Sequence, residues 1–492
     1  MTIWKHGQGN KTLRPWEHLP SLLEEHEHID AYIGSMAVEW IQKYDQERPF
    51  YLQLALVGPH PPFDAPARYR DYFPPEDMLP PIMALPSEPI SPQVSTMLER
   101  RGLPNLTESQ GRLMKSHYYA KIAFDDDVIG SFLKVLREKR LMDNTWIIYT
   151  SDHGEMLGDH RLVQKVVFYE GSLNIPLIIR PPGGTSAWIG NGLTDHYDVV
   201  HTILSAANAA TFEEDHGSSL IPKIEAGESA SDAQIGKEVV FSEVNLYSMA
   251  RTKKYKMTIN SVSRKPLELY DLENDPHEIN NLAGDPKYLT TVENLKEVMS
   301  KWQSSIGDIG LIPEAEIEIQ EKQSSSRFEI MNGKKSDPNH IQKLVSVATK
   351  ASEGISALPD LMKASNSQDP VIRYWAMTGF GNIGRKAGTA AEQLAVKAMN
   401  DTSPNVRIAA ARAVAKFGQL NAALEVLKEE LISEHQWGRL AATIVIDEME
   451  EDARPLVNDL KKLLKTRQPN KYILRVANRA LNDLLGTNNQ VP

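Results

Sequence analysis

Two adjacent residues with metal-binding side chains follow a short apolar segment of the sequence. Asp152 and His153 come directly after the run 145–150, in the stretch Ser-Asp-His-Gly-Glu that ends at Glu155. A carboxylate and an imidazole can bind a divalent cation, and Gly154 permits a tight turn beside them. The alternative is a polar turn that caps the next helix. The sequence therefore indicates either a metal site or a polar turn at this position.

A second acidic run, Asp125 to Asp127, belongs to a different kind of segment. It lies inside a helical pattern over residues 117–141, where consecutive side chains point in different directions. Three adjacent carboxylates on a helix cannot converge on one ion as readily as ligands in a loop. We therefore predict that this run is a solvated helix face.

The elements that must position the candidate residues alternate along the chain. Apolar runs at 49–57, 145–150 and 176–180 each end in a loop rich in Gly, Pro or polar residues, which predicts buried strands. Strands that alternate with helices indicate an α/β sheet with both faces covered. In such sheets functional loops follow the strands, as the stretch after residue 150 does.

The remainder of the chain changes character twice. A strand is predicted at 238–244 and a hairpin at 249–260, and residues 311–340 are polar enough to predict a linker. Beyond them, a polar turn, an arginine and a small-residue helix recur at spacings of 34, 32 and 36 residues. Repeats of this length predict an α-solenoid over 341–487. The recurring arginines are Arg373, Arg407, Arg439 and Arg475.

Composition excludes several classes of function. The net charge of −11 argues against a nucleic-acid partner, since such partners need clustered cations. No apolar run is long enough for a membrane span, and Met1 is not followed by a signal-peptide core. The chain has no cysteine, which excludes disulfides, thiolate nucleophiles and Cys-ligated zinc, and which leaves the compartment open.

Several ordered blocks resemble the sulfatase family of the alkaline phosphatase-like superfamily. They are the stretch from Ser151 through Asp159, His160 and Lys165 to Ile179, the loop Gly58-Pro-His-Pro-Pro-Phe63, and the segments 251–256 and 268–282. The repeats resemble HEAT repeats. The resemblance implies an alkaline phosphatase-like α/β fold, a mixed sheet covered by helices, over residues 1–310. A C-terminal α-solenoid follows the linker.

The resemblance also implies roles for individual residues. Asp152 and His153 would bind a divalent cation, Ca²⁺ by preference, while His60 and Lys165 would hold the sulfate oxygens as catalytic and substrate-binding residues. His60 could also protonate the leaving group. Asp159 and His160 would only support the site. The implied substrate is a sulfated small molecule or glycan, the repeats could bind a protein partner, and family members are often exported.

One feature of the family pattern is missing. Sulfatases convert a Cys or Ser in a Cys/Ser-x-Pro-x-Arg motif to formylglycine, and the 492 residues contain no such motif and no nucleophile in its place. The first family-like block also begins within about 50 residues of Met1, so we expect a sheet that is incomplete at its N-terminal side. The leading hypothesis is a metal-dependent sulfuric ester hydrolase domain that is inactive as given. The alternatives are a phosphonate or phosphate monoester hydrolase and a non-catalytic anion-binding protein.

Overall fold

The computed structural model divides the chain into two compact units. Unit 1 comprises Met1–Val240, Arg251–Lys256 and Glu268–Leu282, and unit 2 comprises Phe241–Ala250, Met257–Leu267 and Ala283–Pro492. No helix in the described part of the chain is both long and apolar enough to span a membrane. The residues that the structure describes are 21–45, 47–210, 216–229, 236–244, 247–261, 264–306, 309–322, 327, 329–330, 338–468 and 470–489.

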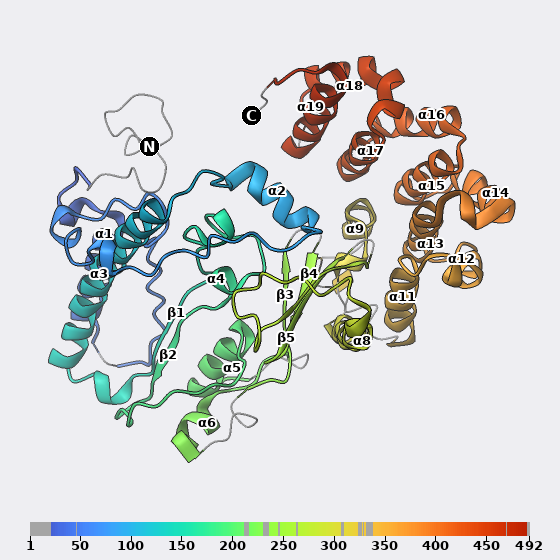
Figure 1. The fold of residues 1–492 in the computed structure, drawn as a ribbon. Coiled ribbons are helices and arrows are strands. Elements are labelled where there is room, and N and C mark those ends of the chain that lie inside the picture. The colour runs from blue at the N-terminus through green and yellow to red at the C-terminus, as the bar shows by residue number, and fades with distance from the viewer. Residues whose placement is uncertain are drawn as a thin grey trace. The chain divides into compact units, whose positions relative to one another are not determined.

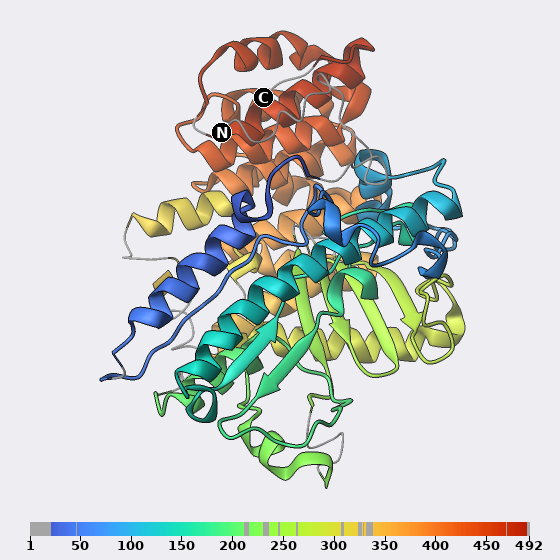
Figure 2. The same ribbon diagram turned by 90° about the vertical axis from the view of Figure 1, so that its left-hand side faces the viewer.

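Unit 1 is organised around one long helix. Helix α3 begins at a capping box in which the Thr107 hydroxyl accepts the Gln110 N–H and the Gln110 side chain accepts the Thr107 N–H. Helix α1 packs along α3, and Figure 2 shows the two helices side by side. The helices of this unit are α1 Ile29–Lys43, α2 Pro92–Arg101, α3 Glu108–Glu138, α4 Glu170–Leu173, α5 His196–Ala206 and α6 Ile221–Ala226.

The first sheet of unit 1 is small. Strands β1, Ile147–Thr150, and β2, Leu177–Arg180, pair antiparallel, with Tyr149 opposite Ile178. Tyr149 and Ile178 are both exposed. Ile147, two residues before Tyr149 and therefore on the same face, packs against the cluster of Ile41, Val135 and Leu136. Helices α1 and α3 thus flank this pair of strands, as predicted.

The predicted strand at 49–57 is an extended segment without a strand partner among the described residues. Its side chains alternate, with Tyr51 and Val57 exposed and Leu52, Leu54 and Leu56 half-buried. A period of two is the pattern of an extended chain with one face packed and one face free. The apolar run was correctly assigned as extended, but the prediction of a fully buried strand was wrong.

A second sheet has four strands in the order β3-β4-β5-β6. The adjacent strands β4 and β5 confirm the predicted hairpin, and the Thr252 N–H donates to the Tyr255 carbonyl at its turn (2.8 Å). The four residues of β5 between its two terminal residues are all buried. The four strands are β3 Val240–Val244, β4 Tyr247–Arg251, β5 Tyr255–Asn260 and β6 Pro266–Asp271.

Unit 2 contains a stack of helix pairs, visible as the orange and red part of Figure 1. Small and aliphatic side chains form one continuous core through the stack, which confirms the α-solenoid. The helices are α8 Leu289–Ile306, α9 Glu314–Glu321, α11 Pro338–Lys350, α12 Leu358–Ala364, α13 Pro370–Ile383, α14 Gly388–Ala398, α15 Pro404–Phe417, α16 Leu420–Glu430, α17 Gln436–Glu448, α18 Val457–Lys465 and α19 Lys471–Leu485.

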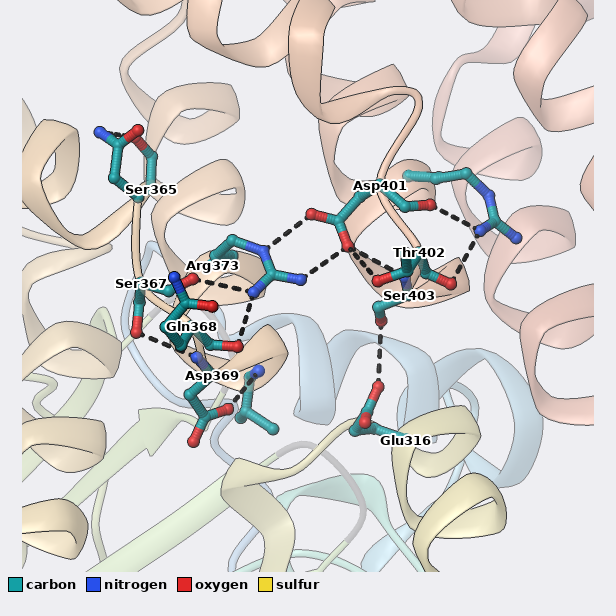
Figure 3. A network of polar contacts seen from close by, with 12 residues as sticks. Glu316, Ser365, Ser367, Gln368, Asp369, Arg373, Asp401, Thr402 and Ser403 are labelled. Atoms are coloured by element: carbon teal, nitrogen blue, oxygen red, sulfur yellow. Dashed lines mark hydrogen bonds and ion pairs between the residues drawn. The ribbon is translucent and has the colours of Figure 1, made fainter.

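Three of the recurring arginines join the start of one helix to the end of the next helix or to the loop after it. Arg373 donates through Nε and Nη2 to the Asp401 carboxylate (both 2.7 Å) and through Nη1 to two carbonyls of the loop before its own helix (Figure 3). Arg407 donates through Nε to the Glu430 carboxylate (2.6 Å) and through Nη1 to the carbonyls of the loop before its helix. Arg439 donates through Nε to the Gln468 side-chain oxygen (3.1 Å) and through Nη1 to the Ser433 carbonyl. Each of these arginines is the fourth residue of its helix. Their predicted equivalence is confirmed.

Arg475, the last of the four, differs in position. It is the fifth residue of α19, and its guanidinium lies 5.6 Å from the centre of the Tyr472 ring. A cation above an aromatic face is stabilising. The predicted equivalence is confirmed for the first three arginines and stays a prediction for Arg475.

Part of the predicted linker 311–340 is packed rather than free. Leu311 and Ile317 are buried in the core of the repeats, and the Trp375 indole donates to the Leu311 carbonyl (2.9 Å). In the same unit, the Ser403 hydroxyl donates to the Glu316 carboxylate of α9 (3.0 Å; Figure 3). The polar composition of the segment concealed these apolar positions, which together cover one side of the helix stack.

Candidate active site

The loop after β1 carries the two predicted metal ligands. Asp152 has an 84% exposed side chain and His153 is one-third exposed, with 3.5 Å between Asp152 Oδ2 and His153 Nε2. The His153 Nδ1 atom lies 2.8 Å from the Gly154 carbonyl oxygen. The Gly154 N–H donates to the Ser172 carbonyl, and a Cβ at residue 154 would lie 2.2 Å from the Gly171 carbonyl oxygen. This close approach explains the glycine and places both ligands just beyond the end of a strand.

These two donors suit a divalent cation in kind but not in number. Ca²⁺ takes about six to eight oxygen ligands. Among the described residues no group of three or more His, Cys, Asp or Glu side chains converges as a metal site. Asp152 and His153 thus provide only part of a coordination shell.

His60 lies in a loop that is hydrogen-bonded by the buried Asp30 and packs against the buried Asp125. The Asp30 Oδ1 atom accepts the N–H groups of Val57 (2.6 Å) and Gly58 (3.1 Å). On the other side, a Cβ at residue 58 would lie 2.1 Å from Asp125 Oδ2, so only glycine fits against that carboxylate. His60 itself is exposed, and its Nδ1 lies 2.8 Å from the Pro61 carbonyl oxygen, which leaves Nε2 for a ligand.

The burial of Asp125 corrects the sequence interpretation. The run 125–127 was predicted to be a solvated face, but Asp125 is only 6% exposed, while Asp126 and Asp127 are exposed as expected. Asp125 follows the buried His117 and Lys121 at steps of four residues, so it lies on the same face of α3. This spacing was the signal in the sequence, and the sequence interpretation also missed Asp30.

Lys165 lies at the end of a second loop, residues 155–165, whose backbone is hydrogen-bonded by the Glu155 carboxylate. The Glu155 carboxylate accepts the N–H groups of Gln164 and Leu157. Burial raises the pKa of Glu155, the two N–H donors oppose that rise, and the nearby charges of Lys165 and His153 oppose it further. Lys165 and His153 therefore act on the same carboxylate.

The loops of His60 and Lys165 share one apolar cluster. Phe63, three residues after His60, and Val163, two residues before Lys165, both pack in the cluster around Met114. The Tyr118 ring of α3 joins them and meets Phe63 edge-on at 5.5 Å. The structure thus brings together the two loops that carry the predicted anion ligands. That both side chains reach one tetrahedral anion stays a prediction.

Asp159 and His160 hold a neighbouring segment in place. The Asp159 carboxylate accepts the Ile82 N–H (2.8 Å), and the buried His160 has its Nδ1 3.0 Å from the Ala84 carbonyl oxygen. Burial lowers the pKa of His160. In the structure both residues fix the backbone of residues 82–84.

Stability should depend on pH through Asp125. Burial, assisted by the charge of Asp30, raises the pKa of Asp125 to about 7, well above the value of about 3.9 in an unfolded chain. The folded state therefore holds a proton that the unfolded state has released. This contribution is complete below about pH 4 and is lost as the pH rises to about 7.

The measurement is the free energy of unfolding in urea between pH 5 and 8. Asp125→Asn should flatten the fall with pH and should be more stable than the parent at pH 8, by an amount on the order of 1 kcal/mol or more. The matched control is Asp126→Asn, on the exposed side of the same helix, which should keep the parent slope. An unchanged slope in Asp125→Asn would show that Asp125 is already ionised at pH 5.

Comparison with known families supplies the remaining evidence. The Sulfatase family model matches residues 3–209, and the C-terminal model of N-sulphoglucosamine sulphohydrolase matches residues 158–305. Residues 3–305 belong to the sulfatase family. The HEAT repeats model matches residues 358–447, within the helix stack of unit 2.

Individual relatives agree with this assignment. The sulfatase region is similar to an arylsulfatase of Clostridium perfringens, with 30% identity over 58% of this chain and 59% of that protein. It is also similar to a multifunctional alkaline phosphatase superfamily protein of Trinickia caryophylli, with 30% identity over 59% of this chain and 62% of that protein. The chain thus spans about three-fifths of the length of these relatives.

A solved structure supports the fold. The phosphonate monoester hydrolase of Silicibacter pomeroyi superimposes with a TM-score of 0.53 at 22% identity, over 62% of this chain and 65% of that one. Identity at this level is evidence for the fold alone, which is alkaline phosphatase-like.

Proposed function

We propose that the sulfatase region is a metal-dependent sulfuric ester hydrolase domain whose anion pocket is formed by His60 and Lys165. The observation that carries this proposal is the shared cluster, in which Phe63 and Val163 bring the two loops together. Asp152 and His153 would contribute part of the shell of a divalent cation, most suitably Ca²⁺, beside the same Glu155 that Lys165 faces. When bound, that cation would neutralise charge on the sulfate oxygens.

The residues of the chain can perform two parts of the chemistry. Lys165 and His60 would donate to the non-bridging oxygens of the sulfate group, which gain charge in the transition state. His60 Nε2, when it carries a proton, could pass that proton to the leaving alkoxide. A sulfated small molecule or glycan is the class of substrate that these groups suit.

We expect no turnover by the 492-residue chain alone. Its 492 residues contain no cysteine and no Ser-x-Pro-x-Arg sequence from which formylglycine could form. Covalent catalysis needs a nucleophile, and none of the described side chains stands in that position of the family pattern. The chain should therefore bind a sulfate ester without hydrolysing it.

Binding of 4-nitrophenyl sulfate by calorimetry, with and without Ca²⁺, tests this proposal. Lys165→Met and His60→Ala should each weaken binding by about tenfold or more, because a hydrogen bond to a charged group contributes about 1.5–3 kcal/mol. Lys134→Met is the matched control, since Lys134 is exposed on α3, and it should bind like the parent. Equal affinity in the parent and Lys165→Met would contradict the assigned pocket.

A phosphonate or phosphate monoester is the second candidate substrate class. The observation in its favour is the 30% identity to the T. caryophylli protein, which is named a multifunctional protein of the alkaline phosphatase superfamily. Titration of 4-nitrophenyl phenylphosphonate beside the sulfate ester separates the two classes. Tighter binding of the phosphonate, lost in Lys165→Met, would favour this alternative.

A further inference from the structure

Two adjoining hollows in unit 2 form a polar furrow on the helix stack. The larger has a volume of about 490 Å³ and the smaller about 250 Å³, and they share Arg412, Lys416 and Glu448. We call these two hollows together the furrow. The larger hollow is lined by Lys265, Ser352, Gly381, Asn382, Gly384, Arg412, Lys416 and Glu448.

The floor of the furrow is rigid. Arg412 donates through Nε and Nη2 to the Glu448 carboxylate (both 2.8 Å) and through Nη1 to the Asn382 side-chain oxygen (3.1 Å). The Asn382 amide donates in turn to the Ala351 carbonyl (2.9 Å). A Cβ at Gly381 would lie 2.7 Å from Arg412 Nη1, so the guanidinium lies directly against the α13 backbone. These contacts use three of the five N–H groups of Arg412 and leave two for a ligand.

The two ends of the furrow carry opposite charge. The exposed Lys265 lines the larger hollow alone. The half-exposed Lys416, which lines both hollows, has its Nζ 3.9 Å from Glu448. Glu450 and Asp452, both exposed, line the smaller end. The basic end stands out in a chain whose net charge is −11, so an acidic ligand should be steered to it.

We propose that the furrow binds an acidic peptide segment of a protein partner, with a carboxylate of the peptide seated between Lys265 and Lys416. The acidic end favours a peptide over a sulfated polysaccharide. A polyanion long enough to fill both ends would place negative charge beside Glu450 and Asp452, within the roughly 8 Å over which charges act at physiological salt. A peptide can carry one acidic group with neutral or basic neighbours.

Fluorescence anisotropy with the full 492-residue chain tests this proposal. The probe is a fluorescein-labelled hexapeptide with one central glutamate, and its counterpart has glutamine at that position. The glutamate peptide should bind saturably and at least tenfold more tightly than the glutamine peptide. Lys265→Glu and Lys416→Glu should each reduce its affinity at least tenfold, while Lys416→Arg should keep it.

The matched control is Lys461→Glu, because Lys461 is an exposed lysine of α18 outside the furrow. It should bind the peptide like the parent, and circular dichroism should show the same helix content in every variant. Equal losses in Lys461→Glu and Lys416→Glu would mean non-specific charge attraction and would overturn the proposal. So would the absence of saturable binding, or tighter binding of a sulfated hexasaccharide at the same lysines. None of these results depends on sulfate-ester binding at His60 and Lys165.

Discussion

Aryl-sulfate hydrolysis by the 492-residue chain, with Ca²⁺ added, is expected to stay at the background rate. His60 and Lys165 can stabilise charge, but no side chain of the chain stands in the family's nucleophile motif. Catalytic triads stripped of their nucleophile retain roughly 10³–10⁴-fold assistance over water. Assistance of that size is invisible against a very slow uncatalysed reaction.

The measurement is release of 4-nitrophenol from its sulfate ester, beside a longer version that carries a Cys-x-Pro-x-Arg segment upstream of Met1. The longer version, with its cysteine converted to formylglycine, should turn over by many orders of magnitude faster than the chain alone. Its Cys→Ala form, in a host that converts only cysteine, is the matched control and should be inactive. Metal-dependent turnover by the chain alone would reveal a nucleophile outside the family motif.

Loss of the buried Lys256 ammonium is expected to destabilise unit 1 strongly. Lys256 is 2% exposed and pairs with Glu170 (2.9 Å) and Glu278 (2.5 Å), and Glu278 is also 2% exposed. The Glu278 carboxylate accepts the Glu170 N–H as well (2.7 Å). Lys256→Met would leave the Glu278 charge buried without its cation, at a cost of about 3–5 kcal/mol.

Urea unfolding of the parent and the variants measures this loss. Lys254→Met is the matched control, because Lys254 is two residues away, 41% exposed and paired with the exposed Glu273; its loss should cost less than about 1 kcal/mol. Adding Glu278→Gln to Lys256→Met should restore part of the stability, since glutamine keeps the acceptor for the Glu170 N–H without the charge. A double variant as unstable as the single one would mean that packing around the Lys256 stem, rather than its charge, is what matters.

The repeats were predictable because their signal is local and repeated. Arg373 and Arg407 donate to the carbonyls five and six residues before them, and Arg439 donates to the carbonyl six residues before it, so the order of residues in these repeats is fixed locally. The extended run at 49–57 was recognisable for the same reason. Whether such a run has a strand partner depends on elements distant in sequence, and composition does not report them.

The site was predictable in its loops and less so in what supports them. Asp152, His153 and Lys165 lie in motif-bearing loops whose residue types alone indicate their chemistry. Asp30, which hydrogen-bonds the His60 loop, and Asp125, which packs against it, come from two different helices, so no spacing along the chain relates them. For Asp125, the steps of four from His117 and Lys121 were visible, but three adjacent aspartates concealed them.

The arginine contacts of unit 2 have a consequence for how such an array can change its length. Each of Arg373, Arg407 and Arg439 holds the loop before its own helix. Each also reaches an acceptor at the end of the next helix or just beyond it: Asp401 after α14, Glu430 at the end of α16 and Gln468 after α18. A helix pair with the loop that follows it therefore carries both the arginine and its acceptor. Duplication or deletion of one whole unit of about 34 residues would leave every remaining arginine with a partner. Insertion of a partial unit would separate an arginine from its acceptor, so whole repeats are the natural step in the evolution of this array.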